Sequence, residues 1–467
     1  MFRISNHYVS KIVFLLLFVE VIVLLGAAYI GAALRMLEFG DAAASAHLDH
    51  FFTSAVAFTI AIIFSMSAMG MYQLDFDEGL RHPFFMKLMP SFLMGFAILA
   101  LVFYMAPELS FGRGTMALVF VLAGFGIFLA RMAFFKSSEA RFLQSRIMFL
   151  GGGPLAKECS ELAQKNSNYH RYDIAGFIPS ASEELCVPES NLLKVRDGDS
   201  LVSLARQYNV SEIVVSVQNR RGGFPIKELL DCKLQGIRVT DAATFFERET
   251  CQIRVDSLQP SWLVFGGGFD QSFVRTFMKR TFDLVCSTLI LLMTFPLMLL
   301  AALLVKMEDR GPVFYSQERV GKDGKTFFVH KFRSMRVDAE KAGKPQWAAQ
   351  NDPRVTRFGN FMRKTRIDEL PQILNVFKGE MSFVGPRPER PYFVEQLIEV
   401  VPYYNVRHSV KPGITGWAQV RYGYGSSAED ALQKLQYDLY YVKNNSLFLD
   451  VLILINTLKV VLFRSGR

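Results

Sequence analysis

The chain has few of the residues that build thiolate or histidine metal sites. It contains five cysteines and seven histidines among 467 residues. The cysteines are at positions 159, 186, 232, 251 and 286, with no Cys-x-x-Cys pair, and the histidines do not cluster. Widely spaced cysteines are typical of reduced, cytosolic or core thiols, and they argue against a metal–thiolate site. No internal repeat or low-complexity segment stands out.

Charge is scarce in the first part of the chain. Hydrophobic residues make up 51% of the sequence, a high share for a soluble protein. Four runs with little or no charge occupy residues 12–34, 51–72, 88–107 and 114–130. Each is close to the roughly 20 residues that a helix needs to cross hydrocarbon. We therefore expect a region of four transmembrane helices over residues 1–135, whose first helix is too long for a cleaved signal peptide.

The basic residues around these runs predict an orientation. They are Arg3 and Lys11 before the first run, Arg81 and Lys87 around the second loop, and Arg131, Lys136, Arg141 and Arg146 after the fourth. The positive-inside rule then places the N-terminus and everything after residue 135 in the cytoplasm. Beside membrane segments, the net charge of +9 favours anionic headgroups or phosphorylated substrates over nucleic acid.

Residues 146–247 alternate strand with helix and predict a small Rossmann-like α/β domain with a parallel sheet. Gly151, Gly153 and Ala156 fit G-x-G-x-x-A at a strand-to-helix turn. That pattern can bind a dinucleotide, but the nearest candidate for the ribose-binding acid, Asp173, lies inside an apolar strand. A tight turn in a structural or dimerising domain is the favoured alternative. Residues 248–276 then form a linker.

A fifth apolar run, at 284–305, contains Pro296 in its middle, where a proline bends a helix. Basic residues precede it (Lys279, Arg280) and follow it (Lys306, Arg310). Two structures fit this pattern. One is a re-entrant helix over 277–307, and the other is a kinked fifth transmembrane helix, which would place the rest of the chain outside the cell membrane. The last stretch, 447–464, carries Asp450, Asn456 and Lys459 at intervals and favours a helix lying in the membrane interface.

The character of the chain changes over residues 308–440. The segment GPVFYSQERVGKDGKTFFVHKFRSM (311–335) alternates turn signals with β-prone residues, and brings Arg319, Lys322, Lys331 and Arg333 close together in sequence. A basic run of this kind is either a solvated face or a phosphate site.

The stretch RIDELPQILNVF places two acids at a helix start. Pro371 is tolerated only within the first helical turn, so Asp368 is expected at or near the N-cap and Glu369 in the first turn. Both carboxylates would then lie at the positive end of the helix dipole. Two adjacent acids among arginines can hold Mg²⁺ together with a diphosphate. An ordinary aspartate N-cap is the alternative.

Two further motifs follow. In VGPRPER, prolines on both sides of Arg387 restrict the backbone, which suits phosphate binding by a preorganised guanidinium, or simply a rigid surface turn. In KPGITGWAQVRYG (411–423), Trp417 and Arg421 are suited to packing on a nucleotide or sugar, or to turn formation alone.

Five of these segments together resemble the bacterial sugar transferases, the polyprenyl-phosphate sugar-1-phosphate transferases also called monotopic phosphoglycosyl transferases. They are KFRSM, DPRVTRFG, RIDELPQ, NVFKGEMSFVGPRPE and RHSVKPGITGWAQV, in that order. The resemblance covers about 277–467, and the upstream helices and α/β domain resemble the large members of the family. PSWLVFGGGF (260–269) is reminiscent of the exopolysaccharide-associated branch.

The resemblance implies a multi-pass protein of the bacterial inner membrane, with a cytoplasmic catalytic domain over 308–467. It implies transfer of a sugar 1-phosphate from a UDP-sugar to undecaprenyl phosphate with release of UMP and with Mg²⁺ as cofactor, to initiate exopolysaccharide or O-antigen synthesis. Asp368 would be the nucleophile that becomes a phosphosugar-aspartate, and Glu369 a metal ligand or proton acceptor. The phosphate and substrate ligands would be Lys331, Arg319, Arg333, Arg387, Arg366 and Gln419. Pro296 would be the kink of a re-entrant helix, although Phe295 stands where the family often has serine.

Two rival functions remain open. A non-catalytic membrane scaffold, acting through the α/β domain, would have no use for the Asp368–Glu369 pair. A glycosyltransferase that moves the sugar without its phosphate would release UDP. The expected partners are a UDP-sugar, undecaprenyl phosphate and the bilayer, without nucleic acid, and the α/β domain is a candidate homodimerisation module.

Overall fold

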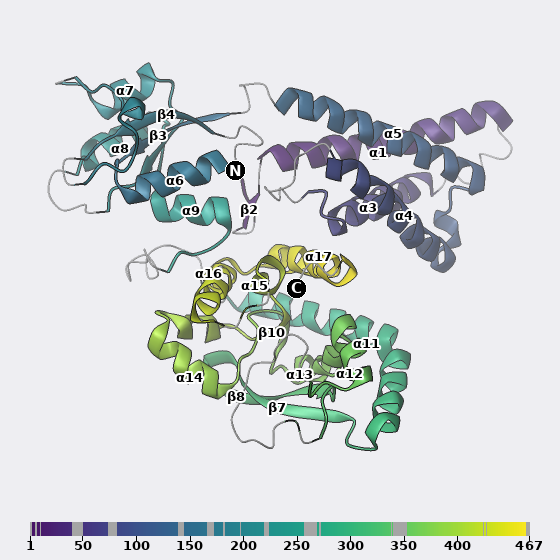
Figure 1. Cartoon of the computed structure of the whole chain (residues 1–467). Coiled ribbons are helices and arrows are strands. Elements are labelled where there is room, and N and C mark those ends of the chain that lie inside the picture. Colours follow the sequence, from purple (N-terminus) through teal and green to yellow (C-terminus); the bar gives the residue numbers. More distant parts are fainter. Residues whose placement is uncertain are drawn as a thin grey trace. The chain divides into compact units, whose positions relative to one another are not determined.

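The chain divides into two compact units in this computed structural model: residues 1–2 and 8–250 form the first, and residues 3–7 and 251–467 the second (Figure 1). The structure describes residues 2–4, 7–9, 11–39, 50–72, 82–138, 144–165, 172–180, 183–196, 198–218, 224–255, 269, 272–337, 339, 353–423, 425 and 427–463. Arg81, Arg141 and all of the 260–269 motif except Phe269 lie outside the described residues. The domain boundaries drawn from the sequence stay predictions.

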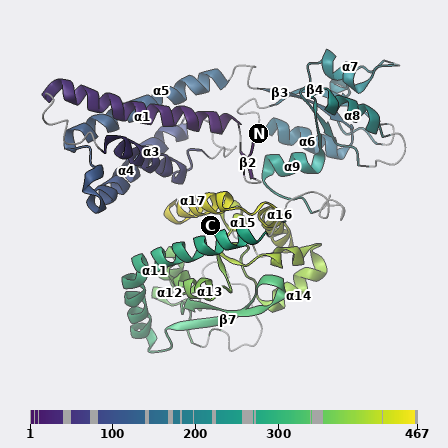
Figure 2. The same ribbon diagram turned by 180° about the vertical axis from the view of Figure 1, so that it is seen from behind.

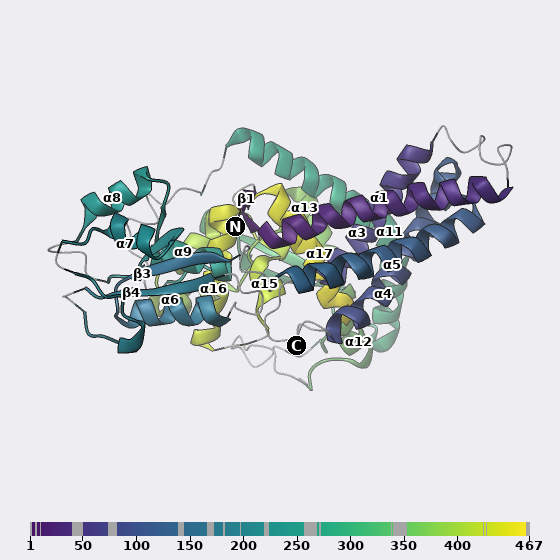
Figure 3. The same cartoon turned by 90° about the horizontal axis from the view of Figure 1, so that it is seen from above.

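The apolar N-terminal runs form the expected helices, shown from two directions in Figures 1 and 3. They are α1 (Lys11–Phe39), α3 (Phe51–Ala68), α4 (His82–Met105) and α5 (Arg113–Ser138). Helix α1 packs along α5, and α3 along α4. All four are long and apolar enough to cross a membrane, as is α11 (Phe273–Asp309) in the second unit. The prediction of several apolar helices in this region is confirmed.

A buried ion pair connects these helices. Glu20 of α1 is fully buried, and its Oε1 accepts a hydrogen bond of 2.5 Å from Nε of Arg131 on α5. The second oxygen of Glu20 accepts from the Tyr72 hydroxyl, which follows α3. Charges inside an apolar helix bundle are costly unless they are paired, so this contact fixes α1 against α5.

The α/β domain contains a four-stranded parallel sheet with strand order β4-β3-β5-β6. Its elements are β3 (Ser145–Leu150), α6 (Pro154–Lys165), β4 (Tyr172–Ile178), α7 (Leu201–Gln207), β5 (Glu212–Val215), α8 (Ile226–Leu234), β6 (Arg238–Asp241) and α9 (Ala242–Thr250). The sequence prediction of an α/β domain with a parallel sheet is confirmed.

The glycine-rich loop of this domain is covered by its own chain. The Glu183 carboxylate lies against Gly153, and the Leu185 side chain lies against Gly152. Asp173 pairs with Arg146 at 3.3 Å, at the start of β4. In a parallel sheet this is the opposite end from the loop after β3, so Asp173 is badly placed for a ribose at that loop. Both observations favour the structural interpretation of the glycines.

Helix α11 contains Pro296, and its ribbon changes direction partway along in Figures 1 and 2. Most of its apolar side chains are exposed, including Leu292, Met293 and Phe295. The bend is the one expected from a proline inside a helix. That the helix re-enters the same side of the membrane stays a prediction.

The remainder of the second unit surrounds two short sheets. Strands β7 (Phe314–Val320) and β8 (Thr326–Phe332) form an antiparallel hairpin, and β9 (Ser382–Val384) pairs in parallel with β10 (Gly413–Thr415). The helices are α12 (Arg357–Thr365), α13 (Ile373–Lys378), α14 (Pro391–Val400), α15 (Trp417–Arg421), α16 (Ala428–Asn444) and α17 (Leu447–Phe463).

Polar contacts hold α17 in place. Asp450, which is 1% exposed, accepts from Nζ of Lys279 on α11 at 2.8 Å and from the Tyr441 hydroxyl at 2.8 Å. Lys279 also donates to the carbonyl oxygen of Val384 in β9. The C-terminal stretch is therefore a helix, as expected, and one of its acids binds within the second unit.

Residues near the N-terminus also contribute to the second unit. The buried His7 ring hydrogen-bonds through Nδ1 to the Tyr440 hydroxyl at 2.8 Å and packs edge-on against Trp417. Burial and the charge of Arg421 lower the pKa of His7 to about 4, so it is neutral at pH 7. Trp417 is itself 1% exposed and donates to the carbonyl of Cys251. It is a core residue, which favours the structural alternative for its loop.

The close approach of β9 and β10 gives a stability prediction. A Cβ on Gly413 would collide with the backbone nitrogen of Gly385. We expect Gly413→Ala to lower the free energy of unfolding by about 1–3 kcal/mol, the usual cost of overpacking. Gly423→Ala is the matched control, because a Cβ there meets nothing within 4 Å. Thermal unfolding of the detergent-solubilised protein measures both, and equal midpoints would contradict the prediction.

Candidate active site

The two adjacent acids lie in a tight turn between two helices. Helix α12 ends at Thr365, Arg366 adopts a left-handed conformation with φ 60°, and a 3₁₀ turn covers Ile367–Gln372 before α13 begins. Both carboxylates are in the first turn. Asp368, expected at or near the N-cap, lies two residues after the N-cap residue, which is Arg366. Pro371 lies inside this 3₁₀ turn, so the turn begins earlier than proline spacing alone predicts.

Glu369 is surrounded by cations. Its Oε1 accepts from Nζ of Lys331 on β8 at 3.0 Å and from the Arg387 guanidinium at 2.8 Å. Its Oε2 lies 3.8 Å from the guanidinium of Arg366. Burial alone would raise the pKa of Glu369, but Arg387, Lys331 and Arg366 outweigh it and hold the pKa well below its ordinary value. Glu369 is therefore ionised throughout the physiological range.

Asp368 has the opposite character. It is 8% exposed, and among the described residues its Oδ1 has no hydrogen-bond partner. Burial and the adjacent charge of Glu369 raise its pKa to about 6, against the attraction of Lys331, Arg363 and Arg366. At neutral pH it is thus mostly ionised, and its Oδ1 is left without a hydrogen-bond partner among the described residues.

Arg319, expected to bind substrate, is occupied by protein groups. It donates to the carbonyl oxygen of Pro388 and to the Gln317 side chain, and lies 3.5 Å from the Glu389 carboxylate. Burial, together with nearby arginines, lowers its pKa to about 10. It holds the segment that carries Arg387 and makes no described contact with the two acids.

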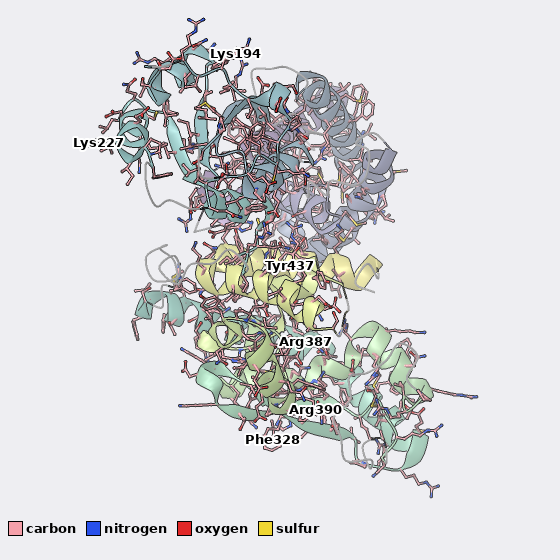
Figure 4. All side chains as sticks on the ribbon, turned by 60° about the vertical axis from the view of Figure 1, so that its left-hand side comes forward. Lys194, Lys227, Phe328, Arg387, Arg390 and Tyr437 are labelled. Atoms are coloured by element: carbon pink, nitrogen blue, oxygen red, sulfur yellow. The ribbon has the colours of Figure 1, made fainter. Side chains whose placement is uncertain are left out.

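Two other expected ligands lie beside glycines. The guanidinium of Arg333 lies directly against Gly311, after the end of α11. Gln419 donates to the carbonyl oxygen of Ile414 and packs beside Gly416. The described contacts therefore bring Lys331, Arg366 and Arg387 to the acid pair, whereas those of Arg319 and Gln419 lie elsewhere. Figure 4 labels Arg387 and Arg390 in the same part of the second unit.

Sequence reasoning missed two residues of this site. Arg363 on α12 acts electrostatically on Asp368 and donates to the Ser334 hydroxyl at 3.0 Å. Asn375 on α13 is fully buried, donates to the carbonyl of Phe328 and accepts from the backbone N–H of His330. Asn375 therefore fixes α13 against the strand that carries Lys331. An asparagine inside an apolar helical pattern was the available signal.

The acid pair has free oxygens that suit a hard cation. Asp368 Oδ1 lacks a described partner, and Glu369 Oε2 has only the distant Arg366 contact. No group of three or more acidic, histidine or cysteine side chains suitable for a metal occurs among the described residues. Two carboxylates without a third protein ligand fit Mg²⁺, which usually keeps water and takes substrate phosphate oxygens.

Comparison with known proteins identifies the family. The family model described as "Bacterial sugar transferase" matches residues 274–464, from α11 to α17. An undecaprenyl-phosphate galactose phosphotransferase of Salmonella typhimurium is 30% identical over 422 residues, which is 83% of each chain. The chain belongs to the bacterial sugar transferase family.

Other relatives of this bacterial sugar transferase match a smaller share of the chain. A UDP-N-acetylgalactosamine-undecaprenyl-phosphate N-acetylgalactosaminephosphotransferase of Aeromonas hydrophila is 44% identical over 238 residues, 51% of this chain and 55% of that protein. A UDP-glucose:undecaprenyl-phosphate glucose-1-phosphate transferase of Escherichia coli is 46% identical over 188 residues, 39% of this chain and 40% of that protein. The chain thus spans about half the length of these two relatives.

The contrast between the two acids predicts opposite effects on stability. At pH 7.5 Asp368→Asn removes a buried charge whose pKa is raised, so we expect stabilisation of about 1–3 kcal/mol. The gain shrinks as the pH falls from about 6 towards the ordinary value of 3.8, because the folded carboxyl then becomes neutral. Glu369→Gln removes the shared partner of Lys331 and Arg387, so we expect a loss of about 2–4 kcal/mol.

Thermal unfolding of the two purified variants checks these signs. The exposed Glu395 on α14 gives a matched control, and Glu395→Gln should leave the midpoint within the error of the wild type. Equal destabilisation by both acid substitutions would show that the two carboxylates share one environment.

Proposed function

We propose that this protein transfers a sugar 1-phosphate from a UDP-sugar to undecaprenyl phosphate, releases UMP, and so initiates exopolysaccharide or O-antigen synthesis. The observation that carries the proposal is an aspartate with an unengaged oxygen beside a glutamate held by three cations. The relatives' names, which include glucose, galactose and N-acetylgalactosamine phosphotransferases, support the same reaction class.

In the first step a carboxylate oxygen of Asp368 attacks the β-phosphorus of the UDP-sugar. A bond forms between that oxygen and phosphorus, and the bond from phosphorus to the oxygen bridging the two phosphates breaks. The electron pair leaves with UMP. In the second step a phosphate oxygen of the lipid attacks the phosphosugar-aspartate, which restores the Asp368 carboxylate and forms a polyprenyl diphosphate sugar. No separate base is required, because both nucleophiles are anions.

The surrounding residues suit this two-step route. A pKa of about 6 keeps Asp368 mostly ionised at neutral pH while retaining more basicity than an ordinary aspartate. Lys331 and Arg387 can stabilise the charge that develops on phosphoryl oxygens. The depressed pKa of Glu369 makes it a poor proton acceptor, which favours its other expected role, as a metal ligand and an anchor for the two cations.

Mg²⁺ fits this site as a proposed cofactor, held by Asp368 and Glu369. When bound, it would neutralise charge on the diphosphate of the donor substrate. The apolar surface of α11 supports a membrane location for the second unit, where a polyprenyl acceptor would be present. The basic residues that flank the apolar helices support a location of the second unit on the cytoplasmic side of the inner membrane, by the positive-inside rule.

Loss of the nucleophile tests the proposal directly. We expect Asp368→Asn to abolish UMP release from a panel of UDP-sugars under Mg²⁺, and to abolish ³²P labelling of the protein from β-³²P-labelled donor. Since the amide is not an anionic nucleophile, the loss should be at least about a thousandfold. Exposed Glu395→Gln is the control that should retain both signals. Release of UDP in place of UMP would support the glycosyltransferase rival, and unchanged function without the carboxylate would support the scaffold.

The raised pKa of Asp368 predicts an acid limit for the first step. Single-turnover UMP release without lipid acceptor should be level above about pH 7, and should fall about tenfold per unit below pH 6, because attack requires the ionised carboxylate. Leaving out the acceptor removes the titration of the lipid phosphate from the profile.

A substitution near Asp368 should move this limit. Arg363 lowers the pKa of Asp368, so Arg363→Gln should shift the midpoint to higher pH, whereas Arg363→Lys should leave it in place. A midpoint near 4 in the wild type, or no shift in Arg363→Gln, would contradict the assignment of this limit to Asp368.

A further inference from the structure

The turn that carries Arg387 is held by donors from four directions. Its sequence is Pro386–Arg387–Pro388–Glu389, and the two prolines have no N–H group, so the turn stabilises itself poorly. Every carbonyl oxygen in it nevertheless accepts a hydrogen bond. The donors are Gly413 N to Pro386, Arg407 to Arg387, Arg319 to Pro388, and Val320 N to Glu389.

Two of these four donors are arginine side chains, and each binds the turn on its backbone. Arg407 donates to the Arg387 carbonyl oxygen at 2.9 Å, and Arg319 donates to the Pro388 carbonyl oxygen at 3.3 Å. These oxygens belong to Arg387, whose guanidinium contacts Glu369, and to the proline that follows it. A guanidinium bound to a backbone carbonyl in this way fixes the position of the main chain, and leaves the neighbouring side chain free to face the site.

Arg407 is itself firmly placed. It is 6% exposed, pairs with Asp438 of α16 at 2.8 Å, and donates to the Tyr404 hydroxyl at 2.6 Å. Asp438 is 2% exposed, so the pair lies in the protein interior. A buried, hydrogen-bonded ion pair is rigid. Through Asp438, helix α16 therefore helps to fix the position of the turn that carries Arg387.

We propose that Arg407 and Arg319 are positioning residues that act on the reaction through Arg387, and that neither binds the substrate. This role rests on the proposed function, because Arg387 is taken to stabilise the phosphoryl group. It differs from the substrate-binding role that the sequence indicated for Arg319. The positioning role predicts that substitution of Arg407 or Arg319 has little effect on the rate of the first step once the Arg387 guanidinium has been removed.

A double-mutant cycle tests the proposal, with single-turnover UMP release from the preferred UDP-sugar as the readout. Arg407→Met and Arg319→Met should each slow this step by about tenfold to about a hundredfold, the range expected for a misplaced catalytic group. In an Arg387→Met background the same substitutions should cost less than about threefold. Arg407→Lys, which keeps a cation beside Asp438, should restore part of the rate.

Controls separate positioning from folding. Tyr404→Phe keeps the bonds of Arg407 to Arg387 and Asp438, so its rate should remain within about threefold of the wild type. Arg319 is less buried than Arg407, with an 18% exposed side chain against 6%, so its arm of the cycle remains informative if Arg407→Met does not fold.

The two proposals fail in different ways. Additive losses in the cycle, or an increase in the KM for UDP-sugar that persists in the Arg387→Met background, would overturn the positioning role. Absence of UMP release by the wild-type protein with every UDP-sugar would instead overturn the proposed function.

Discussion

The attraction between the Glu369 carboxylate and its cations organises the second unit. Lys331 and Arg387 are 38 and 18 residues away from Glu369 in sequence, yet both donate to the same oxygen. That shared acceptor joins the β8 strand, the 3₁₀ turn and the proline-flanked turn around one point. Removing one partner of a buried ion pair is costly, so the position of each of the three segments constrains the other two.

The same arrangement separates the properties of two neighbouring acids. Glu369 receives the direct hydrogen bonds of two cations, and its pKa falls, whereas Asp368 receives none on Oδ1 and its pKa rises. Two carboxyl groups of similar intrinsic acidity thus acquire different chemistry from their surroundings alone. Glu369 is suited to a permanent structural charge, and Asp368 to the nucleophilic role proposed for it.

Much of the fold and part of the site could be predicted from the sequence. Apolar length identified the membrane-type helices, strand and helix alternation identified the parallel sheet, and Pro371 located the acids in a first turn. A basic run contained Lys331 and two prolines flanked Arg387, but it was the resemblance to the family that singled out Lys331 as a phosphate ligand. The sequence did not show that Arg333 faces Gly311, because β8 ends at Phe332 and the alternation stops there.

Residues that act through long-range contacts were beyond sequence reasoning. In the sequence, Arg363 is one of several cations in a basic helix, and Arg407 is one charge in a polar stretch. In the fold each has specific partners. The sequence around Trp417 fitted either packing on a ligand or turn formation. In the structure Trp417 is buried against His7, which comes from the other end of the chain. Such pairings depend on tertiary structure and leave no local pattern.

The polar start of α11 has a consequence for the proposed reaction with a lipid acceptor. Asp283 of this helix accepts from the Ser382 hydroxyl and the Phe383 N–H of β9, and Lys279 reaches the Val384 carbonyl. Strand β9 leads directly into the turn that carries Arg387. On the proposed function, the depth to which the apolar α11 enters the bilayer would set the distance of Asp368 and its neighbours from the membrane surface. A bilayer of different thickness would then move the phosphate of the proposed lipid acceptor relative to them.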